Sequence, residues 1–150
     1  MMTGSERALV DAASLTAHGE WSAADDARPY DIRYCTQRRY LQMRFFGEWN
    51  VETFDRFAAD YRAAIGELAR HGGVTHLLSD GSAYGVQPPE VADRFAELIR
   101  ETAPSPAQRT ACVVPALVNR VQARTGGDLI NARYFRSVDD AADWLFSDEA

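Results

Sequence analysis

The chain has 150 residues, of which 46% are apolar and 25% are charged, and its formal net charge is -6. This length and apolar content fit one globular domain, and the acidic balance opposes the counterion release that drives nucleic-acid binding. All sixteen basic residues are arginine, which excludes mechanisms that need a lysine amine, such as Schiff-base formation or phosphate binding by a Walker-type lysine.

The first 29 residues differ in composition from the rest of the chain. They are rich in Ala, Ser, Asp and Glu and end at Arg28-Pro29, so we expect a flexible or weakly helical arm followed by one domain over residues 30–150. No apolar run is long enough to span a bilayer, and no apolar signal segment stands near the start. We therefore expect a cytoplasmic protein in which Cys35 and Cys112 are free and buried.

The domain begins with a hairpin and a long helix. Apolar and polar residues alternate over Tyr30–Cys35 and Leu41–Phe45, which predicts two antiparallel strands joined through residues 36–38. Asn50 is placed to cap a helix that ends at Gly72-Gly73. The helix carries one apolar stripe at helical spacing: Phe54, Phe57, Ala58, Tyr61, Ile65 and Leu68.

A central strand and the loop after it give the candidate site. Val74–Ser79 predicts a buried strand, and residues 80–87 predict the loop that leaves its carboxyl end, which is where open α/β sheets bind ligands. Asp80-Gly81 is also typical of a tight turn. We expect a ligand or a partner protein to bind through six residues: Asp80, Gly81, Ser82, Tyr84, Gln87 and Glu90.

The remaining elements alternate between helix and strand. They are a helix from Pro89 with Val91, Phe95 and Leu98 inward, a strand over Thr110–Val114, a helix over Leu117–Arg124, a strand over Ile130–Phe135, and a last helix capped by Ser137 with Trp144-Leu145 at its buried end. The order ββαβαβαβα predicts a single α/β domain with a mixed, mostly parallel sheet of about five strands flanked by helices. The Tyr30 strand would form its antiparallel edge.

Two stretches carry a resemblance to a known family: Ser79-Asp80-Gly81-Ser82, and the ending from Tyr134 to Leu145. With this order of elements, the chain resembles the SpoIIAA-like branch of the STAS domains over about residues 30 to 146. These domains are relatives of the bacterial anti-sigma-factor antagonists and are grouped with the lipid-binding Sec14 fold. The resemblance implies a mixed sheet flanked by helices.

In the antagonist branch, the resemblance also implies a switch serine at the start of the helix after the central strand, where phosphorylation controls docking to a partner kinase. Residues 86–90 of this chain contain no hydroxyl group. The chain departs from the family pattern at that position, and Ser82 in the preceding loop is the alternative phosphorylation site.

Other side chains suggest weaker hypotheses. Phe46, Trp49 and Tyr84 are expected either to pack in the core or to line a pocket for a small apolar ligand. The histidines have no metal-ligand spacing, so we expect neither a metal nor a cofactor. His76, Ser82 and Asp80 would form a hydrolase site only if the fold brought them together.

The function that we expect is a non-enzymatic regulatory module of the STAS type, without the usual switch serine, that binds a protein partner or itself as a homodimer. A carrier or sensor of a small apolar or lipid ligand is the alternative, and a weak hydrolase is the third hypothesis.

Overall fold

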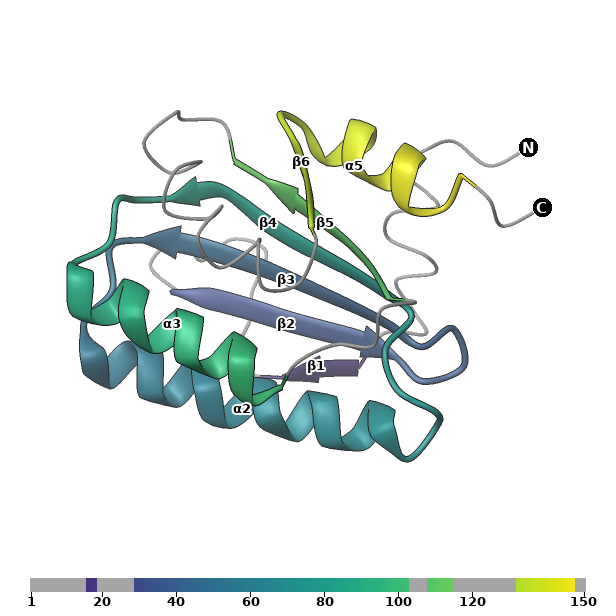
Figure 1. Cartoon of the computed structure of the whole chain (residues 1–150), viewed down its shortest axis with the longest axis horizontal. Helices are drawn as coiled ribbons and strands as arrows, with labels where there is room; N and C mark the ends of the chain where they lie inside the picture. The colour runs from purple at the N-terminus through teal and green to yellow at the C-terminus, as the bar shows by residue number, and fades with distance from the viewer. Residues whose placement is uncertain (1–15, 19–28, 103–107, 115–131, 148–150) are drawn as a thin grey trace.

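The computed structural model describes residues 16–18, 29–102, 108–114 and 132–147. In this part of the chain, six strands form one sheet in the order β1-β2-β3-β4-β5-β6, with three helices packed on it (Figure 1). The elements are β1 Thr16–His18, β2 Tyr30–Cys35, β3 Tyr40–Gly47, α2 Val51–Ala69, β4 His76–Tyr84, α3 Pro89–Glu101, β5 Arg109–Val113, β6 Arg133–Phe135 and α5 Val138–Leu145.

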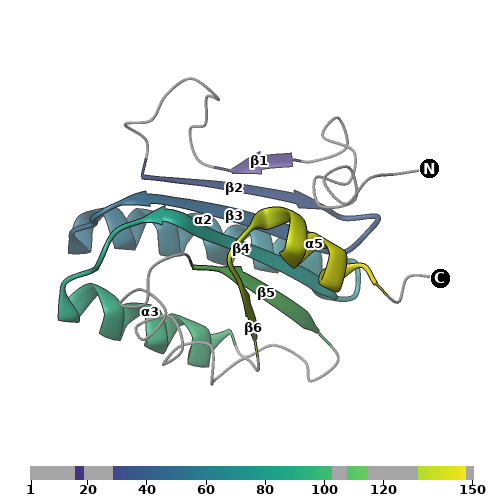
Figure 2. The same ribbon diagram turned by 90° about the horizontal axis from the view of Figure 1, so that it is seen from above.

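The sheet is antiparallel at one side and parallel at the other. β1, β2 and β3 pair antiparallel, whereas β3, β4, β5 and β6 pair parallel. Figure 2 shows the strands following one another across the sheet in chain order. The predicted mixed, mostly parallel sheet is therefore confirmed, and the carboxyl ends of the four parallel strands lie at one end of the molecule.

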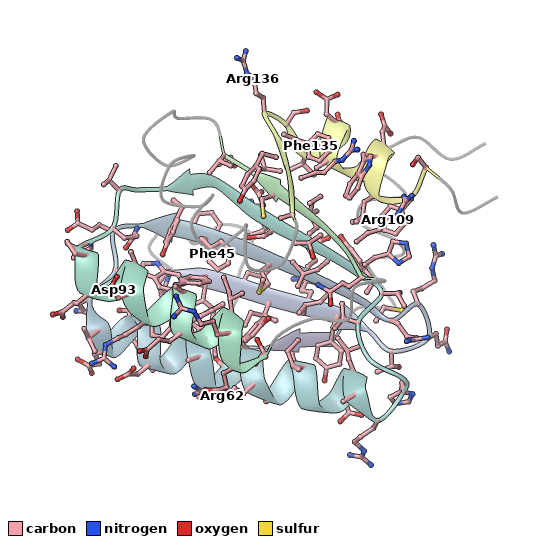
Figure 3. The ribbon with its side chains drawn as sticks, viewed as in Figure 1. Phe45, Arg62, Asp93, Arg109, Phe135 and Arg136 are labelled. Atoms are coloured by element: carbon pink, nitrogen blue, oxygen red, sulfur yellow. The ribbon has the colours of Figure 1, made fainter. Side chains whose placement is uncertain are left out.

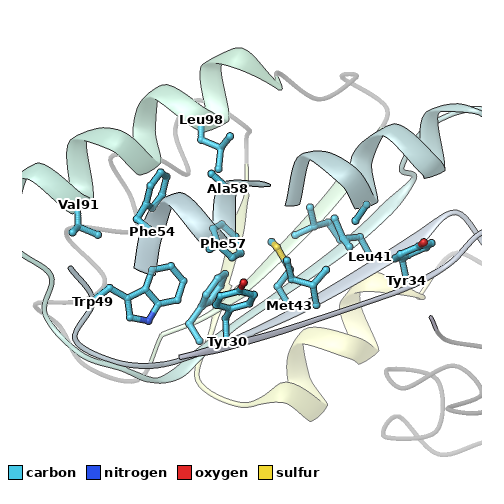
Figure 4. Close-up of a cluster of buried hydrophobic side chains, with 14 of the residues drawn as sticks. Tyr30, Tyr34, Leu41, Met43, Trp49, Phe54, Phe57, Ala58, Val91 and Leu98 are labelled. Atoms are coloured by element: carbon cyan, nitrogen blue, oxygen red, sulfur yellow. The ribbon is translucent and has the colours of Figure 1, made fainter. Parts of the chain in front are cut away.

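Two helices cover one face of the sheet. α2 and α3 lie side by side along it (Figure 1), as two crossovers of the same hand that move in the same direction would place them. Inward residues of β2 and β3, including Ile32 and Leu41, pack there against Phe57 and Leu68 of α2 (Figure 4). This large core explains why the apolar stripe of α2 predicted the helix correctly.

The last helix covers part of the opposite face. Ala141 and Leu145 of α5, followed by Phe146, pack on Tyr40, Leu78 and Val113 of the sheet. The Ser137 hydroxyl caps the helix by accepting a hydrogen bond from the Asp140 backbone N–H at 3.1 Å, as predicted. Leu145 is fully buried, but Trp144 is only half-buried, so the expectation that both form the buried end of this helix is wrong for Trp144.

Three boundaries differ from the predictions. Thr16–His18, in the expected arm, forms β1 and pairs with β2, so the Tyr30 strand is not the edge of the sheet. β4 continues to Tyr84, which makes Asp80 a strand residue and not the first residue of a loop. The predicted helix over Leu117–Arg124 lies outside the described residues.

Candidate functional site

Two loops meet at the carboxyl ends of β3 and β4, and the amide of Gln87 joins them. Its carbonyl oxygen accepts a hydrogen bond from the Trp49 backbone N–H at 2.8 Å, and its NH₂ group donates to the carbonyl oxygens of Gly47 and Gly85 at 2.9 and 2.8 Å. The Gly85 N–H also donates to the Gly47 carbonyl. Gln87 is 5% exposed, so its amide fixes the shape of both loops from below their surface.

Asp80 lies where β4 carries one extra residue relative to β3. The register moves from Arg44↔Asp80 to Phe46↔Ala83, which is a β-bulge. One carboxylate oxygen of Asp80 accepts the Ser82 N–H at 3.0 Å, and the other lies 3.8 Å from Arg44 Nε. The predicted turn chemistry of Asp80 is therefore present, but it operates within a strand.

A tight contact with the neighbouring strand favours glycine at position 81 in the bulge. A Cβ atom at this position would stand 3.1 Å from the Val113 carbonyl oxygen of β5. The glycine lets the bulged strand keep its close approach to its neighbour. Gly81 is therefore glycine for a structural reason, and the residue is buried.

The exposed residues of this region form a small surface, which we call the carboxyl-end surface. It consists of Ser82, Ala83, Val86, Pro89 and Glu90. Val86 is 47% exposed, and no other large apolar residue in the described part of the chain is classed as exposed. Of the six residues predicted to bind, Ser82 and Glu90 lie on this surface, whereas Asp80, Gly81 and Gln87 are buried and Tyr84 is half-buried.

Tyr84 and Trp49 belong to an aromatic cluster, but Phe46 does not. The Trp49 and Tyr84 rings are 5.3 Å apart, and Phe45 lies 5.7 and 5.3 Å from them between the sheet and α3 (Figure 3). Phe46 follows Phe45 in β3 and so points to the opposite face, where the Arg44 guanidinium lies 5.3 Å from its ring. The grouping of Phe46 with the other two rings is therefore wrong.

The aromatic cluster is closely packed. Edge-to-face and tilted contacts connect Trp49 to Tyr30, Phe45, Phe57 and Tyr84 at 5.3 to 5.8 Å, which is the usual spacing of packed aromatic side chains. Burial raises the pKa of the Tyr84 hydroxyl well above its ordinary value, so this hydroxyl stays protonated. Trp49 therefore packs in the buried core, and Tyr84 packs against it.

The start of α3 offers few groups to an anion. Its N-cap is Pro88, which makes no side-chain cap, and Pro89 has no N–H to donate. The backbone N–H groups of Val91 and Ala92 both donate to the Pro88 carbonyl. Among the residues of the first turn, the Glu90 side chain also brings negative charge.

The residues of the hydrolase hypothesis are not assembled. His76 and Asp80 lie on the same face of β4, but four residues of strand place them about 13 Å apart. The His76 ring stacks on Phe146 at 5.2 Å, and its Nδ1 atom lies 2.9 Å from the Thr75 hydroxyl. Within the residues that the structure describes, no group of three or more His, Cys, Asp or Glu side chains could hold a metal ion.

Sequence reasoning missed two contributors to this region. Arg44, the partner of Asp80, stands in an alternating strand that gives no sign of its ion pair. Val86 is a single apolar residue in a loop that contains Gly and Pro, and this pattern gives no sign of its exposure. Val86 is exposed beside buried Gln87, whose hydrogen bonds to Trp49 and Gly47 connect residues 38 and 40 positions apart.

No helix of the described segments is long and apolar enough to cross a membrane. No protein-family model matches the chain, and no curated protein matches it. Among solved structures, the chain is similar to an uncharacterized protein of the DUF3478 family from Shewanella loihica PV-4, described as having a SpoIIAA-like fold. The similarity has a TM-score of 0.55 at 16% sequence identity and covers 88% of this chain and 93% of that chain. The fold of this chain is therefore SpoIIAA-like, as its sequence predicted.

Proposed function

We propose that the chain is a non-enzymatic regulatory module of the STAS type that binds a protein partner, or a second copy of itself, through the carboxyl-end surface. The observation that carries the proposal is the set of hydrogen bonds made by the Gln87 amide, which we call the Gln87 tie. This one buried amide holds both loops in place beneath exposed Val86 and Pro89. A surface that is rigid before binding loses little conformational entropy when a partner docks. The SpoIIAA-like fold supports the same function.

The polar groups of this region favour binding over catalysis. The Asp80 carboxylate accepts a hydrogen bond from the Ser82 N–H and pairs with Arg44. Neither of these two partners could act as a base toward the Ser82 hydroxyl. A nucleophilic serine needs such a base within hydrogen-bond reach. These contacts of Asp80 support a binding role for the region over a catalytic one.

The proposed module acts without a phosphorylation switch at the start of α3. Residues 86–90 carry no hydroxyl group, and the proline cap leaves few N–H donors for a phosphate. A phosphate on Ser82 would stand beside the Asp80 carboxylate that accepts the Ser82 N–H, where like charges repel. We propose that binding at this surface is controlled by the partner and not by phosphorylation of this helix.

Native mass spectrometry of the gently purified protein tests this function against its alternatives. We expect the bare polypeptide mass, together with a dimer or a complex with a partner protein that Val86→Glu removes. A small apolar molecule bound in stoichiometric amount would instead make the chain a carrier. Turnover of a generic ester that is lost in Ser82→Ala would make it an enzyme.

A further inference from the structure

Three arginines from distant parts of the sequence gather at the end of the molecule opposite the carboxyl-end surface. Arg38 lies in the hairpin turn before β3, Arg109 begins β5, and Arg133 begins β6. All three flank the C-terminal turn of α5, beside which Figure 3 shows Arg109. We call Arg38, Arg109 and Arg133 the arginine strip.

Aromatic rings hold the strip in place. The guanidinium carbons of Arg109 and Arg133 each lie 5.2 Å from the centre of the Trp144 ring, and that of Arg38 lies 6.0 Å from the centre of the Phe146 ring. Contacts of this length between a cation and a ring are favourable. They restrict the long side chains before any ligand arrives, which lowers the entropy cost of binding.

The two outer arginines keep their charge available. In the part of the chain that the structure describes, Arg38 and Arg133 are exposed, and their guanidinium groups form no hydrogen bond or ion pair. Arg109 differs, because it donates to the Trp144 and Leu145 carbonyls at the end of α5. Arg109 thus satisfies the helix end, while Arg38 and Arg133 remain for a ligand.

We propose that the arginine strip binds an extended acidic segment of a partner protein. Neighbouring strands are about 4.8 Å apart, so three strand spacings from β3 to β6 separate the backbones that carry Arg38 and Arg133 by about 14 Å. Acidic side chains at alternate positions of an extended peptide project on one side and repeat every 6.8 Å or so, so that three of them span about the same length. An exposed guanidinium also pairs well with a carboxylate.

The same features disfavour a nucleic acid as the ligand. Guanidinium groups cover the Trp144 ring, so this ring is not free to stack on a base, which is the main contact of single-strand binders. The net charge of -6 also repels a polyanion at long range. A short peptide with a few acids carries less charge and meets a weaker repulsion.

Fluorescence anisotropy with a labelled peptide of alternating Glu and Ser tests the proposal, with the matching Gln and Ser peptide as the control. We expect the acidic peptide to bind and the control peptide not to bind, with weakening as salt rises. The double variant Arg38→Gln/Arg133→Gln should weaken binding about fivefold, and it should fold normally because neither side chain makes a hydrogen bond. Arg56→Gln/Arg94→Gln removes the same charge at the other end of the molecule and should leave binding unchanged.

Equal binding of the two peptides, or equal loss in both arginine double variants, would overturn the proposal. So would a single-stranded oligonucleotide that binds more tightly than the peptide and loses its binding with Arg38→Gln/Arg133→Gln.

Discussion

Gln87 joins the loops after β3 and β4 through one amide group. Gln87→Ala would leave the Trp49 N–H and the Gly47 and Gly85 carbonyls without this partner, and unsatisfied buried groups are costly. We expect a loss of about 2–3 kcal/mol in the free energy of unfolding, measured by chemical denaturation. Gln37→Ala, in the exposed hairpin turn, should change stability by less than about 0.5 kcal/mol. Similar losses in both variants would show that the hydrogen bonds of the Gln87 tie do not stabilise the folded protein as described.

The thiol of Cys112 is expected to be inert in the folded protein. Burial raises its pKa to about 12, although the bond with the Ser79 hydroxyl opposes this shift. Because folding raises the pKa of this thiol, its protonated form contributes to the stability of the folded protein. This contribution is fully present below the unfolded pKa of about 8.5. That contribution is lost as pH rises from there toward the folded value.

A thiolate-directed reagent measures this directly in a Cys35→Ser variant, where Cys112 is the remaining thiol. We expect no reaction at about pH 8 until denaturant is added, because the thiolate is the reactive form. Cys112 of β5 is half-buried, whereas Cys35 is buried as expected, so rapid reaction of the native protein would contradict the raised pKa of the Cys112 thiol.

At the residue scale, the sequence predicted side chains whose role depends on near neighbours and missed those whose role depends on distant ones. The alternation in β3 correctly predicts that Phe45 shares a face with Leu41 and Met43. The same alternation puts Phe46 on the opposite face, away from Trp49. The role of Gln87 in joining two loops gave no signal in the sequence, because two of its partners, Trp49 and Gly47, lie 38 and 40 positions away.

At the element scale, short-range signals were reliable. Asn50 accepts the Thr53 N–H at 2.8 Å and caps α2, and Gly72 and Gly73 end it with positive φ angles. β1 has only three residues and carries no alternating pattern, so it gave no signal. β4 was predicted too short because Asp80-Gly81-Ser82 has the composition of a turn, whereas pairing with both neighbours keeps these residues in a bulged strand.

Two glycines associated with α2 should respond in opposite directions to substitution by alanine. Gly66 is exposed inside the helix with nothing near a new Cβ atom, so Gly66→Ala should stabilise the protein by about 0.5–1 kcal/mol. Gly73 follows the helix with φ +93°, so Gly73→Ala should destabilise it by about 1–2 kcal/mol. Thermal unfolding measures both. A stabilising Gly73→Ala would mean that the chain does not turn there as described.

At the scale of the whole molecule, the two ends of the sheet differ in chemistry. The carboxyl ends present Val86 and Pro89 beside the exposed acid Glu90, and the amino ends present exposed Arg38 and Arg133. The order of elements predicted the fold, because alternation of helix and strand leaves few ways to build a sheet. It could not predict the arginine strip, whose members are up to 95 residues apart in the chain and meet only through the strand order.

The most direct test of an interaction module at the carboxyl-end surface is photo-cross-linking in cells that produce the protein. A photoreactive amino acid replaces Val86 in one variant and Ala59, which is exposed on α2, in a matched control. We expect position 86 to give one discrete adduct, either with a partner protein or with a second copy of this chain, and position 59 to give none. Absence of an adduct at position 86, or the same adducts at both positions, would contradict the proposed surface.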